Sequence, residues 1–112
     1  MRYMKYQGTY PARDYVDSLD VAAKAALVAS AKFISDGHQL PSSKGHQLKG
    51  RFSKLYELKP EGHRFYGFFH STPTSDVLYL ACGAPKRNEK AQDADRDRAL
   101  TMYEDFLAHL GQ

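Results

Sequence analysis

Residues 52–85, FSKLYELKPEGHRFYGFFHSTPTSDVLYLACGAP, decide the fold. Three runs in this stretch have the residue pattern of β-strands. The first alternates between polar and apolar residues, the second is rich in aromatic residues, and the third is β-branched and apolar. Proline and glycine mark the short turns between them. The strand-like runs are 52–59, 63–70 and 77–82, and the turns are 60–62 and 71–76. This order predicts an antiparallel meander of three strands.

Helical patterns lie on both sides of the meander. Residues 20–35 are rich in alanine, the strongest helix former, and carry an apolar stripe at helical spacing. Pro11 suits the first turn of a short helix over 11–18. A last helix is predicted over about 90–110, because its apolar residues repeat at intervals of three and four. The first part of that helix is very polar, so we expect it to lie in solvent or against a partner.

The predicted order of elements is β-α-α-β-β-β-α. Its first strand covers about 2–7, and residues 37–50 form a loop because glycine, proline and serine interrupt the periodicity there. Two N-terminal helices packed on one face of a small antiparallel sheet, with a C-terminal helix, give an α+β fold. We expect a single domain over 1–112, since the chain shows no internal repeat and no linker.

The composition excludes several classes of protein. Hydrophobic residues make up 42% of the chain, but no apolar run approaches the roughly 20 residues that a membrane-spanning helix needs. The N-terminal residues have no apolar segment of the signal-peptide type. Cys82 is the only cysteine, which excludes an intramolecular disulfide and a cysteine-rich metal site. We therefore expect a cytoplasmic protein with no membrane partner.

Positive charge is concentrated in part of the chain. The formal net charge is +3 and the pI is about 9.0. Six cations lie between Lys44 and Arg64, and only Glu57 and Glu61 oppose them. Such a surface attracts polyanions, although a solvated face rich in lysine is the simpler interpretation. The candidate RNA-binding residues are Lys49, Arg51, Lys54, Lys59 and Arg64, with Phe68 as a residue on which a base could stack.

The central strand of the meander carries an unusual set of side chains. In a regular pleat Arg64, Tyr66, Phe68 and His70 share one face, whereas the alternate residues 65, 67 and 69 suit packing under the helices. Arginine can hold a phosphate, aromatic rings can stack on bases, and imidazole or phenol groups can transfer protons. Ordinary sheet packing of the two aromatic rings, and a surface position for His70, remain the alternatives.

Signatures of the common enzyme classes are absent from the sequence. It contains no phosphate-binding glycine loop, no nucleophile elbow and no zinc-protease motif. His38 and His46 lie in the predicted loop, but their spacing matches no compact ligand set. We therefore expect no metal and no cofactor.

Several motifs occur together in the order found in one protein family. They are Leu48-Lys49-Gly50, Lys54-Leu55-Tyr56-Glu57-Leu58-Lys59, Gly62-His63-Arg64-Phe65-Tyr66 and the run from Val77 to Arg87. In this order the chain resembles the RelE/HigB-type toxins of type II toxin–antitoxin systems over about 48–110, and the preceding strand and helices fit the family's order. The resemblance implies a RelE-like fold and a ribosome-dependent mRNA endonuclease (mRNA interferase) that needs no metal. It also implies a cognate antitoxin, a toxin–antitoxin hetero-oligomer, and the ribosome with its mRNA as partners.

The resemblance assigns roles to individual residues. Arg64 matches the arginine that contacts the scissile phosphate in RelE-like toxins, and Lys86 and Arg87 match the basic element that follows the last strand. Glu57 occupies the glutamate of the family's "LYEL" pattern. RelE-type members place lysines where this chain has Leu55 and Glu57, and many have a tyrosine near the position of Asp93. The proton-transfer residue therefore stays open among His70, Tyr66 and Glu57.

Two other functions remain compatible with the same resemblance. One is a ParE-like toxin that acts on gyrase by binding protein, which would induce the SOS response while mRNA stays intact. The other is a regulator that keeps the fold, binds RNA or protein, and has lost nuclease activity.

Overall fold

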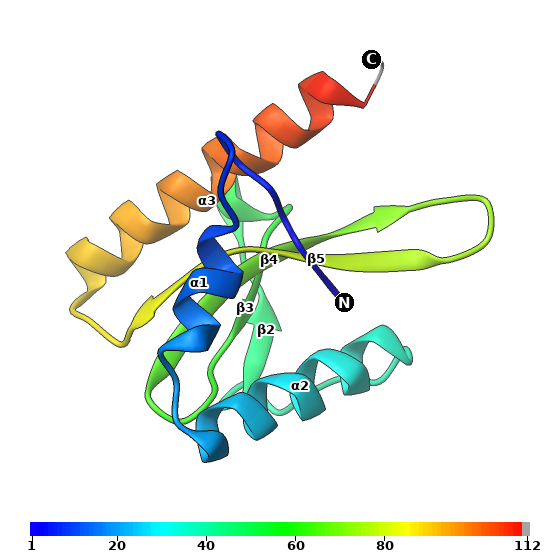
Figure 1. The fold of residues 1–112 in the computed structure, drawn as a ribbon. Coiled ribbons are helices and arrows are strands. Elements are labelled where there is room, and N and C mark those ends of the chain that lie inside the picture. Colours follow the sequence, from blue (N-terminus) through cyan, green and yellow to red (C-terminus); the bar gives the residue numbers. More distant parts are fainter. Residues whose placement is uncertain (111–112) are drawn as a thin grey trace.

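The strand-rich stretch forms the centre of a five-stranded sheet in the computed structural model, which describes residues 1–110 (Figure 1). The strand order is β1-β5-β4-β3-β2, and β1 runs parallel to β5 while the other pairs are antiparallel. The strands are β1 (Arg2–Tyr3), β2 (Gly45–Gln47), β3 (Tyr56–Leu58), β4 (His63–Ser71) and β5 (Asp76–Pro85). The α+β class is confirmed, and the long β4–β5 hairpin is the axis of the sheet.

The sheet differs from the prediction in two respects. It is mixed rather than antiparallel, because the edge strand β1 pairs in parallel with β5. It also contains β2, which falls inside the predicted loop over 37–50. Gly45 makes this strand possible, since a Cβ there would lie 2.9 Å from the carbonyl oxygen of Glu57. The glycine that indicated a loop instead allows two strands to approach closely.

The strand predicted over 52–59 is also shorter than expected. Residues Gly50–Phe52 form a 3-10 turn, and pairing with β4 begins only at Tyr56. The N-terminal strand ends at Tyr3 instead of continuing to about residue 7, where Tyr6 and Thr9 form an isolated bridge. Alternation between polar and apolar residues does not by itself show where a strand finds a partner.

Two helices cover one face of the sheet, as predicted. They are α1 (Pro11–Asp17) and α2 (Val21–Ser35). Asp20 caps α2 by accepting a hydrogen bond from the Ala23 amide at 2.8 Å. The shared core on this face contains Ala12, Leu27, Phe65, Leu78 and Leu80. Phe65 thus packs under the helices, in agreement with the predicted pleat.

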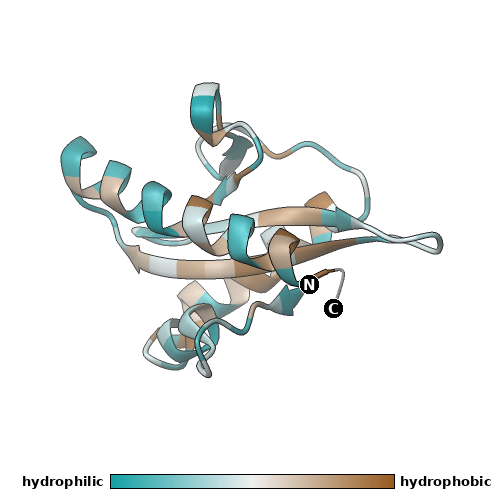
Figure 2. Ribbon diagram, turned by 90° about the horizontal axis from the view of Figure 1, so that it is seen from above, coloured by the Kyte–Doolittle hydropathy of each residue, from teal (hydrophilic) through white to brown (hydrophobic). Residues whose placement is uncertain are grey.

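The last helix, α3 (Glu89–His109), covers the opposite face. Asn88 caps it by accepting a hydrogen bond from the Ala91 amide at 2.9 Å. We call residues 89–98 the polar half of α3 and residues 99–109 its apolar half. Figure 2 shows teal, hydrophilic turns along α3 beside the brown strands of the central hairpin. The core under this helix includes Leu55, Tyr66, Phe68, Ala99 and Met102.

A β-bulge changes the register in the middle of the hairpin. Tyr66 pairs with Cys82, but Gly67 pairs with Leu80, so Ala81 is the extra residue. As a result Ala81 and Cys82 both pack in the core under α3. Within residues 1–110, no helix has the length and apolar character required to cross a membrane.

Candidate functional site

Three polar side chains form a row across neighbouring strands on the α3 side of the sheet. His46 of β2 pairs with Glu57 of β3, and Glu57 pairs with Tyr66 of β4. Directly paired residues point to the same face of a sheet, so pairing alone brings the imidazole, the carboxylate and the phenol together. Lys59 lies two residues beyond Glu57 and therefore on the same face.

Glu57 is the centre of this cluster. It is only 1% exposed and has three cationic or titratable neighbours. Its carboxylate oxygens lie 3.1 Å from Arg96 Nη2, 3.8 Å from Lys59 Nζ and 3.9 Å from His46 Nε2. A buried carboxylate is costly unless it is paired, so these groups are what allow Glu57 to lie inside the protein. We call His46, Glu57, Lys59, Tyr66 and Arg96 the Glu57 site.

The Glu57 site also contains buried polar atoms without partners. Tyr66 Oη, His46 Nδ1 and Arg96 Nε have no hydrogen-bond partner among residues 1–110. Almost all buried polar atoms in proteins are satisfied, and unsatisfied ones often mark a functional or incompletely closed region. The fit between α3 and the sheet is therefore incomplete at this point.

Burial changes the titration of two groups in the Glu57 site. It raises the pKa of Tyr66, and the nearby Glu57 carboxylate raises it further, so the phenol stays protonated. Burial lowers the pKa of His46, Lys59 adds to this effect, and Glu57 opposes it. The His46 imidazole is thus neutral at pH 7, because burial disfavours its protonated form.

Arg64 adds a cation near this site. It lies two residues before Tyr66 on β4, so the side chains of Arg64 and Tyr66 share a face of the sheet. Lys59 lies at the same end of the sheet. Arg64 Nη1 donates a hydrogen bond to the His63 carbonyl oxygen at 2.8 Å, and Lys59 Nζ donates one to the Ser42 carbonyl oxygen at 3.0 Å. The acceptor of the Arg64 bond is neutral, so Arg64 keeps charge with which to bind an anion, whereas Lys59 also lies 3.8 Å from the Glu57 carboxylate.

Two further predicted cations are paired with the polar half of α3. Arg51 forms an ion pair with Asp97, and Arg87 forms a two-pronged ion pair with Asp95. Most residues of the polar half are exposed, in agreement with the expectation that it lies in solvent, but Asp95 and Arg96 also pair with other parts of the protein. The remaining predicted cations, Lys49, Lys54 and Lys86, are exposed.

Several predicted site residues are not where the sequence suggested. Phe68 is 1% exposed and packs against Tyr103 and Phe106 of α3, with ring centroids 4.8 and 5.0 Å apart. It cannot stack on a base in this arrangement, which corrects that prediction. Tyr66 is 0% exposed and lies beneath the same helix. The pleat on which both predictions rested is correct, but the sequence did not reveal that α3 covers this face.

His70 does not join the Glu57 site. It lies four residues beyond Tyr66 on β4, which is about 13 Å along a strand. Its ring packs edge-on against Phe106, with centroids 5.3 Å apart. His70 therefore belongs to the apolar contact with the end of α3, and its predicted role in proton transfer has no support from this geometry.

Other residues of chemical interest did not stand out in the sequence. Arg96 lies 39 positions from Glu57, and only the docking of α3 brings the two together. The Tyr15 hydroxyl of α1 lies 2.6 Å from His63 Nδ1, and this hydrogen bond joins α1 to the start of β4. Helix periodicity gives no sign of such distant pairs.

Two remaining features are the single cysteine and the expected absence of a metal site. Cys82 is buried, as predicted, and burial raises the pKa of its thiol to about 12, so the thiol stays protonated while it is covered. In the described part of the chain, no group of three histidine, cysteine, aspartate or glutamate side chains could hold a metal ion.

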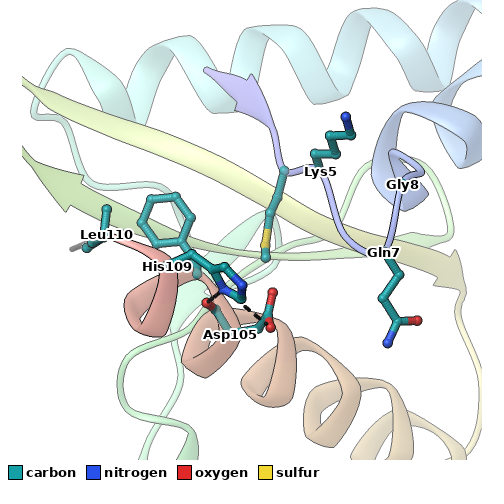
Figure 3. Close-up of a pocket in the computed structure, with 8 residues that line it drawn as sticks. Lys5, Gln7, Gly8, Asp105, His109 and Leu110 are labelled. Atoms are coloured by element: carbon teal, nitrogen blue, oxygen red, sulfur yellow. Dashed lines mark hydrogen bonds and ion pairs between the residues drawn. The ribbon is translucent and has the colours of Figure 1, made fainter. Parts of the chain in front are cut away.

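One cavity lies away from the Glu57 site. It has a volume of about 310 Å³ and lies between the N-terminal loop and the end of α3 (Figure 3). Lys5, Gln7, Asp105 and His109 line it. His109 Nδ1 lies 2.7 Å from the Asp105 carbonyl oxygen of its own helix. The Asp105 carboxylate also lies 3.6 Å from His109 Nδ1, and both side chains are exposed one turn apart on α3.

Comparisons with known proteins do not assign the chain to a family. No protein-family model matches it, and no curated protein matches it either.

Proposed function

We propose that this protein is a RelE/HigB-type toxin that cleaves mRNA on the ribosome without a metal ion. The observation that carries the proposal is the Glu57 site, in which a carboxylate and a neutral imidazole lie 3.9 Å apart with Lys59 beside them. The RelE-like fold is part of the proposal. Its support is the α+β arrangement with two helices on one face and one helix after the last strand.

These groups suit the chemistry of RNA cleavage by the neighbouring 2′-hydroxyl. Glu57 accepts the proton of the 2′-hydroxyl, and the 2′-oxygen then attacks phosphorus and displaces the 5′-oxygen, which takes a proton from solvent water as it leaves. Lys59 and Arg64 stabilise the negative charge that develops on the phosphorane. The products are a 2′,3′-cyclic phosphate and a free 5′-hydroxyl. The reaction requires no oxidant and no cofactor.

A direct assay tests this proposal. Purified protein is added to translating ribosomes with excess chelator, and the mRNA is mapped for new 5′ ends and cyclic phosphates. We expect cleavage by the wild type and a loss of about 100-fold or more in Glu57→Gln, because removal of a general base typically costs 10²–10⁴-fold. Glu61→Gln is the matched control, since Glu61 is exposed in the turn before β4.

An assay in cells complements the first. Expression should arrest growth and translation, and Arg64→Ala combined with Arg87→Ala should relieve the arrest. The matched control replaces Lys24 and Lys32 of α2, which lie on an exposed helix surface, by alanine. Undiminished translation in cells that express the wild type would contradict the proposal.

A second function is favoured by one observation. Arg96 pairs with Glu57 at 3.1 Å, so the carboxylate is occupied and covered in this structure. This favours a regulator that binds RNA through its cations and does not cleave it. Intact mRNA together with retained RNA binding would distinguish the regulator from the nuclease.

A further inference from the structure

The polar half of α3 occupies the surface that the proposed function requires for RNA. Asp95 and Asp97 project from it to Arg87 and Arg51, which are two cations of the basic surface. From the same segment Arg96 reaches into the sheet and pairs with Glu57. The Asp95 and Asp97 carboxylates thus occupy the positions on Arg87 and Arg51 that RNA phosphates would take. The Arg96 guanidinium covers the Glu57 carboxylate.

The two halves of α3 are held in different ways. The apolar half is anchored by buried side chains, since Ala99 and Met102 are both 0% exposed and Phe106 packs on Phe68. The polar half is held mainly by ion pairs, and both partners of Arg51–Asp97 are more than half exposed. Exposed ion pairs contribute little to stability and are screened by salt.

The contact beneath the polar half is also incomplete. Arg96 Nε and Tyr66 Oη are buried and have no hydrogen-bond partner among residues 1–110. Each unsatisfied atom favours an open state in which water or a ligand can reach it. The exposed Arg51–Asp97 pair and the unsatisfied atoms below make this half of α3 less firmly held than the apolar half, although the buried Arg96–Glu57 pair must break when it separates from the sheet.

We propose that residues 89–98 form a displaceable lid over the Glu57 site, and that single-stranded RNA displaces it by replacing Asp95 and Asp97 on Arg87 and Arg51. The identity of the displacing ligand, RNA, rests on the proposed function. The apolar half stays packed on the sheet, and the lid moves about its junction with that half. The lid keeps the free protein inactive until an RNA backbone competes for the arginines.

Hydrogen–deuterium exchange of the intact chain tests the lid directly. The variant Asp95→Asn/Asp97→Asn removes the carboxylates that hold it. The control Asp17→Asn/Glu104→Gln changes the net charge by the same amount, at exposed residues of α1 and of the apolar half. We expect amides of residues 89–98 to exchange about fivefold faster in the variant than in the control, with residues 99–109 unchanged. Equal exchange in the two proteins would overturn the lid.

The wild-type chain supplies a second readout that needs no substitution. Cys82 Sγ lies 4.0 Å from the Asp95 carbonyl oxygen, directly under the polar half. N-ethylmaleimide, which is uncharged, should label Cys82 faster as ionic strength increases, because salt screens the ion pairs. A labelling rate that does not increase with salt would contradict a lid held by ion pairs.

Addition of an RNA oligonucleotide separates the lid from the proposed function. Bound RNA should speed amide exchange in residues 89–98 while it slows exchange in β3. If this occurs and mRNA on translating ribosomes stays intact in the cleavage assay, the lid is supported and the nuclease proposal fails. If RNA slows exchange in residues 89–98, RNA does not displace the lid and the inference is overturned, whether or not cleavage occurs.

Discussion

Glu57 illustrates how one buried residue depends on partners from three elements. Its carboxylate is held by Arg96 of α3, Lys59 beyond the end of β3 and His46 of β2. Removing one member of a buried ion pair leaves the other charge uncompensated, which costs more than the pair contributes. Residues in this cluster should therefore affect stability and activity together.

Glu57→Gln should lower the free energy of unfolding by about 1–3 kcal/mol, because the buried Arg96 loses its closest carboxylate on the sheet and keeps only Asp93 and Glu89. Urea denaturation measures the change. Glu61→Gln, in the exposed turn, should stay within about 0.5 kcal/mol of the wild type. Equal stability of the two variants would show that the pair with Arg96 contributes nothing.

His46 should make stability depend on pH. Its pKa in the folded state is lowered by burial, so the unfolded chain binds more protons just below the ordinary histidine value of about 6.5. The free energy of unfolding therefore falls as pH decreases from 7 towards the folded pKa. His46→Gln should flatten this dependence in denaturation curves recorded from pH 7 to 5. A slope equal to that of the wild type would mean that His46 does not couple folding to pH.

At the scale of elements, the bulge in the β4–β5 hairpin sets which side chains face α3. The extra residue at Ala81 turns both Ala81 and Cys82 towards the helix. Both are small, and the space above them is filled by Ala99 and Met102 of α3. The bulge thus fits the hairpin to the helix that covers it.

Gly67, which lies at this bulge, should not tolerate a side chain. A Cβ on Gly67 would overlap the Tyr79 carbonyl oxygen, which is rigid backbone in the paired strand. Gly67→Ala should therefore lower the melting temperature by several degrees, as expected for a strained core substitution. Ser71→Ala, at the exposed end of the same strand, is the control. A melting temperature equal to that of the control would mean that the hairpin adjusts without cost.

At the scale of the whole molecule, charge is divided between the two sides. The exposed cations Lys49, Arg51 and Lys54 lie around the 3-10 turn next to α3, whereas Lys24 and Lys32 lie on α2 across the sheet. Lys49, Arg51 and Lys54 thus form a basic rim beside α3, whose own side chains include Glu89, Asp93 and Asp97. This rim is the part of the surface to which an RNA backbone would bind under the proposed function.

Salt dependence should distinguish the two groups of cations. Each phosphate contact to a single strand contributes about −0.7 to the slope of log affinity against log salt. Replacing Lys49, Arg51 and Lys54 by alanine should reduce the slope by about 2 in fluorescence-anisotropy titrations with an RNA oligonucleotide. Replacing Lys24 and Lys32 by alanine should leave it nearly unchanged. Equal effects from both sets would mean that RNA contacts do not favour the α3 side.

The sequence by itself determined the helices and the main hairpin. Helices predicted over 20–35 and about 90–110 correspond to Val21–Ser35 and Glu89–His109, and the strand predicted over 63–70 corresponds to His63–Ser71. These predictions succeeded because propensity and periodicity act between residues a few positions apart. The pleat also placed Arg64, Tyr66 and Phe68 on one face correctly.

Only the tertiary structure decided which surfaces are open. The cover that α3 places over Tyr66 and Phe68, the strand at Gly45–Gln47 and the pairing of Glu57 with Arg96 all join segments distant in sequence. The free energy of such contacts comes from burial and charge pairing between whole elements, which no local pattern encodes. The sequence therefore supplied the chemical groups of the Glu57 site, and the packing of α3 determined that this site is closed in the free protein.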